Sequence, residues 1–158
     1  MLFNSYTFFL FFAVVYGLYL TLGHKRQNHM LLLASYVFYG SWDWRFLSLI
    51  WISTIIDYYC GLRIERESEK KRRKLFLTIS MCSNLGILGI FKYYDFFADS
   101  LSRLTNVFGW NIEPLFLHLV LPVGISFYTF QTMSYTIDIY FQKLKPTKDF
   151  LSFALYVA

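Results

Sequence analysis

The sequence contains only two cysteines, and their positions suggest neither a metal site nor a disulfide framework. Cys60 and Cys82 both lie within apolar runs, where a free cysteine behaves as a small buried hydrophobe. The chain has no CxxC pair and no cysteine spacing typical of zinc ligands. We therefore expect no metal site and no bound cofactor.

Charged residues are also scarce. They make up 16% of the 158 residues, against about 25% in an average soluble domain. Apolar residues make up 56%, and they occur in long blocks rather than in alternation with polar residues. Blocks of this kind are typical of helices that lie in a membrane. The composition therefore predicts an all-α fold, a polytopic bundle of transmembrane helices.

The net charge of +5 does not indicate a nucleic-acid-binding protein. The basic residues are gathered in short segments between apolar runs, at 23–29, 63–74 and 143–149. No basic face with interleaved aromatic residues continues along a domain, as it would in a nucleic-acid-binding surface. Clusters of lysine and arginine beside apolar runs follow the positive-inside rule instead, so we expect all three segments to face the cytoplasm.

The apolar runs predict the membrane spans. The first run is not preceded by a basic residue and is not followed by a small-residue cleavage site, so it indicates a retained span rather than a signal peptide. The sequence GSWDWR at Gly40–Arg45 predicts a turn at a membrane surface. The predicted helical runs cover residues 2–22, 30–39, 46–62, 75–91 and 115–140. With the three basic segments inside, this order places the N-terminus outside.

Two further segments are not continuously apolar: one is amphipathic and the other is highly charged. Residues 92–108 place apolar side chains such as Phe96, Leu101 and Leu104 near helical spacing, with polar residues mostly between them. This pattern predicts an amphipathic helix that lies in the outer membrane interface and ends near Gly109. Residues 63–74 carry the highest density of charge and predict either a solvated loop or a helical extension.

The segment LPVGISFYTFQTMSYTIDIY, at Leu121–Tyr140, is apolar enough for a membrane yet carries many polar groups. In hydrocarbon each such group costs free energy unless a partner satisfies it. One interpretation is helix packing through small residues and a kink at the proline. The other is the wall of a substrate tunnel. Its candidate residues are Pro122, Gly124, Ser126, Thr129, Gln131, Ser134, Tyr135 and Asp138.

Two carboxylates in the apolar runs need partners. Asp57 lies about two-thirds along its run, and we expect it either to pair with Arg63 or Arg66 or to line a cavity. Asp138 lies near the inner end of its run, where an ion pair with a lysine of segment 143–149 is the simpler account.

His118 lies in the apolar sequence LFLHLVLP. A histidine in a membrane run is a candidate general base, because its pKa lies near neutral pH. Its place near the outer end of the run favours a structural or interfacial role over a catalytic one.

Several of these segments resemble the membrane-bound O-acyltransferase family, in the bacterial branch that acetylates exopolysaccharides such as alginate. The motif Pro-x-Gly-Ile-Ser-Phe with its trailing Tyr-x-x-Asp-x-Tyr is the most specific of them. The likeness covers nearly the whole chain. The segments that carry it are LPVGISFYTFQTMSYTIDIY with KLKPTKDFLSFALYVA, MLFNSYTFFLFF, LLLASYVFYGSWDWRFLSLIWISTIIDYYCG and LGILGIFKYYDFF.

The resemblance implies an enzyme of the bacterial plasma membrane. It would move an acyl group, in this branch acetyl, from a cytosolic donor such as acetyl-CoA to a polysaccharide hydroxyl, with a secreted or periplasmic protein as a possible partner. A histidine deep in the membrane tunnel performs the transfer in this family, and the resemblance places it beyond residue 158. We therefore expect residues 1–158 to be the N-terminal portion of a longer membrane domain, inactive by itself.

Two other classes stay open at this point. Kinked, glycine-bearing membrane segments with polar groups also build the sites of transporters and channels, although no inverted repeat is visible here. A non-catalytic membrane scaffold is the third class. Acyl-donor-dependent labelling of the full-length protein separates the enzyme from both.

Overall fold

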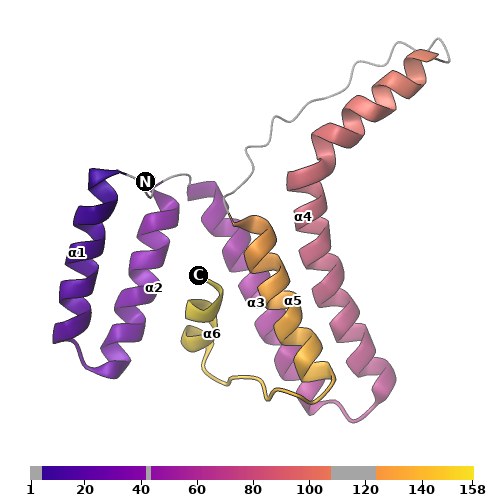
Figure 1. The fold of residues 1–158 in the computed structure, drawn as a ribbon. Helices are drawn as coiled ribbons and strands as arrows, with labels where there is room; N and C mark the ends of the chain where they lie inside the picture. Colours follow the sequence, from indigo (N-terminus) through magenta and orange to yellow (C-terminus); the bar gives the residue numbers. More distant parts are fainter. Residues whose placement is uncertain (1–4, 42–43, 108–123) are drawn as a thin grey trace.

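The structure, a computed structural model, describes residues 5–41, 44–107 and 124–158. These residues form six α-helices and no strand, which confirms the all-α prediction for this part of the chain (Figure 1). The helices are α1 Tyr6–Thr21, α2 His24–Gly40, α3 Trp44–Arg66, α4 Lys70–Val107, α5 Ile125–Tyr140 and α6 Phe150–Val157.

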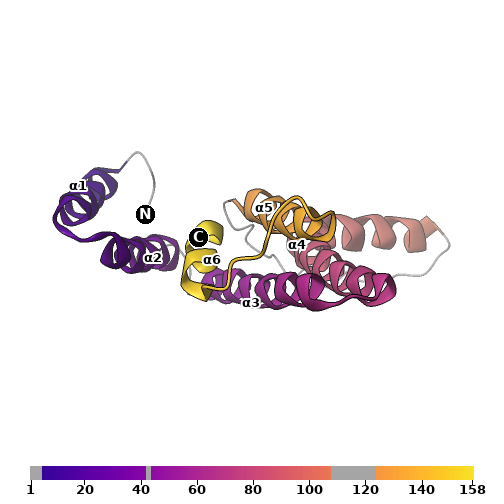
Figure 2. The same ribbon diagram turned by 90° about the horizontal axis from the view of Figure 1, so that it is seen from below.

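The core of the molecule is a bundle of α3, α4 and α5, which lie side by side (Figure 1). The short helix α6 packs between this bundle and α2, and α1 packs on α2 alone. Seen from below, α1 and α2 lie at one end of an elongated assembly, and α4 and α5 lie toward the other (Figure 2). Helix α3 contacts α2, α4, α5 and α6, so it is the central element of the described chain.

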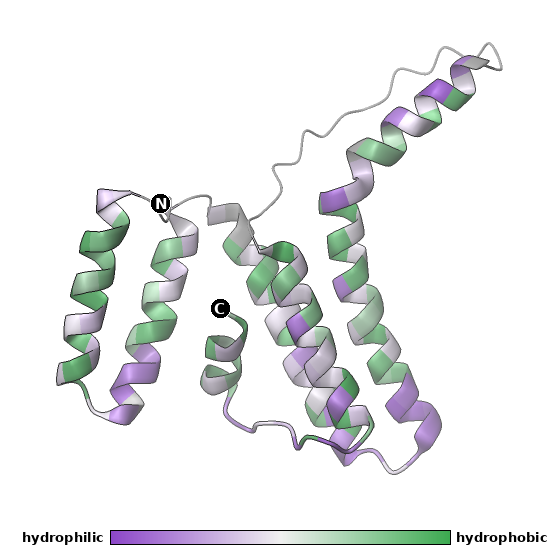
Figure 3. Ribbon diagram, in the orientation of Figure 1, coloured by the Kyte–Doolittle hydropathy of each residue, from purple (hydrophilic) through white to green (hydrophobic). Residues whose placement is uncertain are grey.

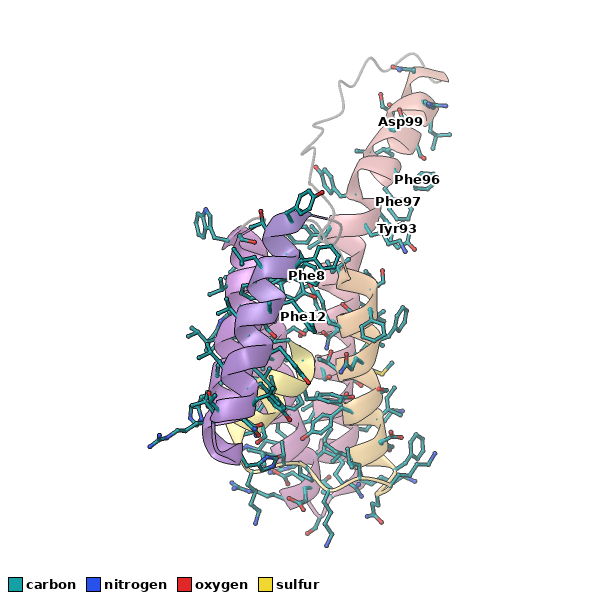
Figure 4. The ribbon with its side chains drawn as sticks, turned by 60° about the vertical axis from the view of Figure 1, so that its left-hand side comes forward. Phe8, Phe12, Tyr93, Phe96, Phe97 and Asp99 are labelled. Atoms are coloured by element: carbon teal, nitrogen blue, oxygen red, sulfur yellow. The ribbon has the colours of Figure 1, made fainter. Side chains whose placement is uncertain are left out.

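Within the described residues, two helices are long and apolar enough to cross a membrane, at Leu47–Arg66 in α3 and Lys70–Tyr94 in α4. Helix α1 is a shorter apolar helix with no buried residue. It packs on α2 through aromatic side chains. The ring of Phe8 lies 5.8 Å from that of Phe38, and Phe12 stacks one turn further along α1 (Figure 4). The outward faces of α1 are therefore apolar, as a lipid-facing helix requires.

Hydrophilic residues gather at one end of the bundle (Figure 3). They lie at the start of α2, around the connection from α3 to α4, and in the segment before α6. These are the three basic segments 23–29, 63–74 and 143–149, which the fold brings to a common side. An arrangement of this kind is what a single cytoplasmic face requires.

The basic segment 23–29, which lies between the predicted helical runs 2–22 and 30–39 and was therefore expected to be a loop, is mostly helical. Residues 24–29 form the first turns of α2, and only Leu22 and Gly23 separate the two helices. Lysine, arginine and glutamine are good helix formers, so the basic composition does not prevent a helix here. The side chain of Gln27 donates a hydrogen bond from Nε2 to the carbonyl of Tyr19 at 2.9 Å, which fixes the tight turn.

Residues 92–107 are helical as predicted, but they continue α4 rather than form a separate helix. The sequence has neither glycine nor proline between Gly89 and Val107, so nothing breaks the backbone ladder. This last part of α4 leans away from the bundle, and it carries Phe96 and Phe97 (Figure 4). Both rings are about two-thirds exposed. Asp99 pairs with Arg103 at 3.0 Å on this segment.

Helix α6 begins at a well-formed cap. The carboxylate of Asp149 accepts hydrogen bonds from the backbone N–H groups of Leu151 at 3.3 Å and Ser152 at 3.2 Å. The Ser152 hydroxyl also donates to it. These bonds, the Ser152 hydroxyl first among them, hold the pKa of Asp149 below its usual value. The cap orients a helix that packs against α2 and α3.

We expect this cap to be sensitive to acid. The pKa of Asp149 is lowered in the folded state. Its contribution to the stability of the cap is therefore present above the unfolded-state pKa of about 4, and it is lost as the pH falls through the folded-state pKa. The protection factors of the amides of residues 151–153, which are corrected for the intrinsic pH dependence of exchange, should therefore fall several-fold at low pH. Asp149→Asn keeps a capping oxygen and should remove this pH dependence, whereas Asp149→Ala should accelerate exchange at every pH. Identical pH profiles for the wild type and Asp149→Asn would contradict the assignment.

Candidate functional site

A cluster of buried polar side chains lies at the centre of the three-helix bundle. Each helix contributes two residues, and none of the six is more than 2% exposed. This polar cluster consists of Ser53 and Asp57 from α3, Ser80 and Asn84 from α4, and Thr132 and Thr136 from α5.

The spacing of the polar cluster follows directly from helix geometry. In each helix the two residues are four positions apart, so they lie one turn above the other on the same face. Three such faces meet where α3, α4 and α5 pack together. The sequence therefore held a signal for this site, three polar pairs at i and i+4 in separate apolar runs. Of the six residues, only Asp57 stands out when each is considered singly, because it is a carboxylate in an apolar run.

Asp57 is the acceptor at the centre of the polar cluster. The Ser80 hydroxyl donates to its Oδ1 at 2.5 Å, and Asn84 Nδ2 lies 2.9 Å from Oδ1 and 2.8 Å from Oδ2. The amide oxygen of Asn84 in turn accepts from Ser53 Oγ at 2.7 Å and from Thr132 Oγ1 at 3.3 Å. One continuous network thus joins all three helices.

Asp57 has no cationic partner among the described residues. The guanidinium of Arg63 donates instead to the hydroxyl of Tyr59, from Nε at 3.0 Å and from Nη2 at 2.6 Å. Arg66 makes no ion pair within the described part of the chain either. The expected pairing of Asp57 with one of these arginines is therefore wrong, because the neutral donors Ser80 and Asn84 of α4 occupy both carboxylate oxygens.

The chemical role of the polar cluster is to join helices. Hydrogen bonds between membrane helices are worth about 0.6 kcal/mol on average and up to about 1.7 kcal/mol. Several of them meet at Asp57 and Asn84, and together they pair the buried polar groups of the cluster. The network fixes the height and rotation of α5 against α3 and α4. It thereby positions the α5 residues that the sequence marks as candidates for a tunnel wall.

The beginning of α5 depends on a glycine. Gly124 precedes the helix with φ +82°, in the left-handed region that favours glycine. A Cβ at this position would lie 3.5 Å from the hydroxyl oxygen of Tyr39 in α2. Pro122 and His118 lie outside the described residues. Ser126, one residue into α5, is half-buried.

The other tunnel-wall candidates face α6 and the connection before it. Gln131 donates from Nε2 to the carbonyl of Tyr156 at 2.7 Å. The hydroxyl of Tyr135 accepts from the backbone N–H of Thr147 at 3.1 Å, and its ring lies 4.6 Å from that of Phe153. These contacts join α5 to the last described helix. A role in a substrate tunnel stays a prediction for both residues.

For three other polar residues of α5, Thr129, Ser134 and Asp138, the structure shows burial or contacts within α5 and the segment directly after it. Ser134 is exposed and donates to the carbonyl of Gln131 at 2.8 Å, while Thr129 is buried. Asp138 is half-buried at the end of α5, where its backbone carbonyl accepts from the N–H of Lys143 at 2.9 Å. Its carboxylate makes no ion pair within the described ranges, so the expected bridge to the lysines of segment 143–149 is absent there.

Two buried tyrosine hydroxyls give a direct test of packing around α5. The hydroxyl of Tyr128 has no hydrogen-bond partner in the described chain, whereas that of Tyr135 is paired with Thr147. We expect Tyr128→Phe to leave the free energy of unfolding unchanged or to raise it by about 1 kcal/mol. The matched variant Tyr135→Phe should lower it by about 1 kcal/mol. Thermal unfolding in detergent measures both changes, and equal losses in the two variants would contradict the structure.

Fold and site together define a helical bundle of membrane-spanning type, whose core is joined by a buried polar network. The chain matches no model of a known protein family and no solved structure. It is, however, 42% identical along its whole length to a probable alginate O-acetylase AlgI of Pseudomonas aeruginosa, and 40% identical to the protein of that name from Azotobacter vinelandii. A peptidoglycan O-acetyltransferase of Helicobacter pylori is 33% identical over 90% of the chain.

These similarities confirm the resemblance to the bacterial O-acetyltransferases that the sequence motifs indicated. The chain spans 31% of the length of the Pseudomonas protein, 32% of the Azotobacter protein and 27% of the Helicobacter protein. Two helices of the described residues have the length and composition of membrane spans, and together with these similarities they indicate a membrane protein.

Proposed function

We propose that this chain is the N-terminal part of a membrane-bound O-acyltransferase that transfers acetyl groups to the hydroxyl groups of a cell-surface polysaccharide. The observation that carries the proposal is the similarity along the whole chain to proteins named for O-acetylation of alginate and of peptidoglycan. Both named acceptors are polysaccharides that bear hydroxyl groups. No observation favours a transporter or a scaffold over this function.

In this proposal the donor is acetyl-CoA or another cytosolic acyl donor, and it approaches the basic end of the bundle. The common position of the three basic segments supports a cytoplasmic face at that end (Figure 3). Such a face suits an anionic, phosphate-bearing donor by electrostatic attraction. The N-terminus then lies outside, in a multi-pass protein of the bacterial plasma membrane, and the acyl group leaves toward a secreted or periplasmic partner.

The proposed role of the described helices is to form one wall of the tunnel through which the acyl group passes, and to hold that wall in position. The polar cluster fixes α5, and α5 carries Gly124, Ser126, Gln131 and Tyr135. The catalytic histidine of the family is expected in a later helix. Residues 1–158 alone are therefore proposed to be inactive.

The experiment that tests the donor uses membranes that contain the full-length protein. Incubation with radiolabelled acetyl-CoA and de-esterified polysaccharide should give label in the polysaccharide, and mild alkali should release it because the bond formed is an ester. Membranes from a strain without the gene are the control. Label that does not exceed this control would contradict acetyl-CoA as the donor.

A further inference from the structure

A pocket opens at the basic end of the bundle, away from the polar cluster. It has a volume of about 420 Å³ and lies between the α3–α4 connection and the segment after α5. Ile139, Leu144 and Pro146 supply an apolar side. The polar side is formed by Glu65, Glu67, Ser68, Arg73, Gln142 and Lys145.

Arg73 is held in place at the edge of this pocket with most of its donors unused. Its Nη2 donates to the carbonyl of Tyr140 at 2.7 Å, and its guanidinium carbon lies 5.4 Å from the centre of the Tyr140 ring. Its Nε is buried and has no hydrogen-bond partner in the described chain. A planar guanidinium has five N–H donors in a fixed fork that suits the oxygens of a phosphate.

The charges that line the pocket are balanced in number but are not paired with one another. Glu65, Glu67, Arg73 and Lys145 give two negative and two positive side chains. The ion pairs of the described residues lie elsewhere, at Arg72–Glu69 and Arg103–Asp99. A ligand that brought one positive and one negative group would satisfy both signs, whereas a polyanion would meet the two carboxylates unfavourably.

The level at which the pocket lies relative to the membrane indicates the source of such a ligand. Its residues 65–73 flank the ends of the two candidate spans, Leu47–Arg66 and Lys70–Tyr94. In a membrane these ends lie at the level of the lipid headgroups. An apolar side next to four charged groups matches the boundary between a lipid headgroup and its acyl chains.

We propose that this pocket binds the headgroup of a zwitterionic phospholipid with a primary amine, of the phosphoethanolamine type. The phosphate binds Arg73 and Lys145, and the ammonium group donates hydrogen bonds to Glu65 and Glu67. A primary ammonium has three N–H donors for these carboxylates, whereas a trimethylated amine has none and favours aromatic surroundings. The site is independent of the proposed acyl transfer.

The test uses the full-length protein in detergent, incubated with equal amounts of phosphatidylethanolamine, phosphatidylcholine and phosphatidylglycerol. Native mass spectrometry then counts the lipids retained. We expect phosphatidylethanolamine to be retained preferentially, and Arg73→Gln to weaken its binding about tenfold. Arg72→Gln is the matched control, because Arg72 is exposed and pairs with Glu69 outside the pocket, so it should leave retention unchanged.

The double variant Glu65→Gln/Glu67→Gln is a second test in case Arg73→Gln misfolds, because it leaves the contact of Arg73 with Tyr140 intact. It should lower the preference for phosphatidylethanolamine over phosphatidylcholine about tenfold. Preferential retention of phosphatidylglycerol, equal losses in Arg72→Gln and Arg73→Gln, or displacement of the lipid by coenzyme A would each overturn the proposal. Retention of none of the three lipids would overturn it as well.

Discussion

Asp57→Ala should lower the free energy of unfolding by about 2–3 kcal/mol, because the buried Ser80 hydroxyl and Asn84 amide lose the carboxylate that accepts from both of them. The loss should appear as loosened contact between α3 and α4, the helices that Asp57 joins directly. Thermal unfolding of the full-length protein in detergent, followed by tryptophan fluorescence, measures the change.

Asp57→Asn is the control for the role of charge. The asparagine carbonyl, in the place of Oδ1, can accept from Ser80 and Asn84. Its amide, in the place of Oδ2, faces Ser53 Oγ at 3.4 Å but also meets the Asn84 Nδ2 donor at 2.8 Å. The Ser53 hydroxyl already donates to Asn84, so it is free to accept there. The variant should therefore lose about 1 kcal/mol, less than Asp57→Ala, because most of the hydrogen bonds are kept and one donor–donor contact replaces the bond from Asn84 to Oδ2. A loss as large as that of Asp57→Ala would show that the network requires a negative charge.

Gly61→Leu should separate α3 from α5 and cost about 3 kcal/mol. Gly61 is buried, and a Cβ on it would lie 3.1 Å from Ile139 Cδ1 and 3.2 Å from Tyr135 Cε1. A leucine cannot fit unless the side chains of Ile139 and Tyr135 move, and a shift of α5 that made room for it would strain the Thr132 and Thr136 bonds to α4 as well. Small residues at such crossings are how membrane helices approach closely.

Gly86→Leu in α4 is the matched control for this overpacking. A Cβ at Gly86 meets nothing within 4 Å, and the residue is exposed. The substitution replaces a poor helix former by a good one, so stability should stay unchanged or rise by about 0.5 kcal/mol. Equal destabilisation of the two variants in thermal unfolding would contradict the packing of α5 on α3.

Much of the fold followed from composition and periodicity. Long apolar blocks predicted helices, and basic segments between them predicted that their ends share one side, as α2, α4 and the segment before α6 do (Figure 3). Helix boundaries were less predictable. Segment 24–29 is hydrophilic in composition, but its residues also favour helix, and the length of α4 depends on the absence of a breaker before Val107.

The partners of Asp57 could not be found from its own helix. A carboxylate in an apolar run suggested a nearby cation, and the arginines of α3 were the nearest in sequence. The actual donors, Ser80 and Asn84, lie 23 and 27 residues away, so they depend on how the helices pack. Three polar pairs at i and i+4 were visible in the sequence, but only packing shows that their faces meet.

Acetylation of the cell-surface polysaccharide tests the central proposal most directly. The acetyl ester content would be measured by proton NMR in the organism that carries the gene, in a strain from which the gene is deleted, and in strains that regain it. We expect that deletion removes acetyl esters, that the intact gene restores them, and that the gene with Asp57→Ala restores much less. An acetyl content that deletion leaves unchanged would contradict an O-acyltransferase function for the protein.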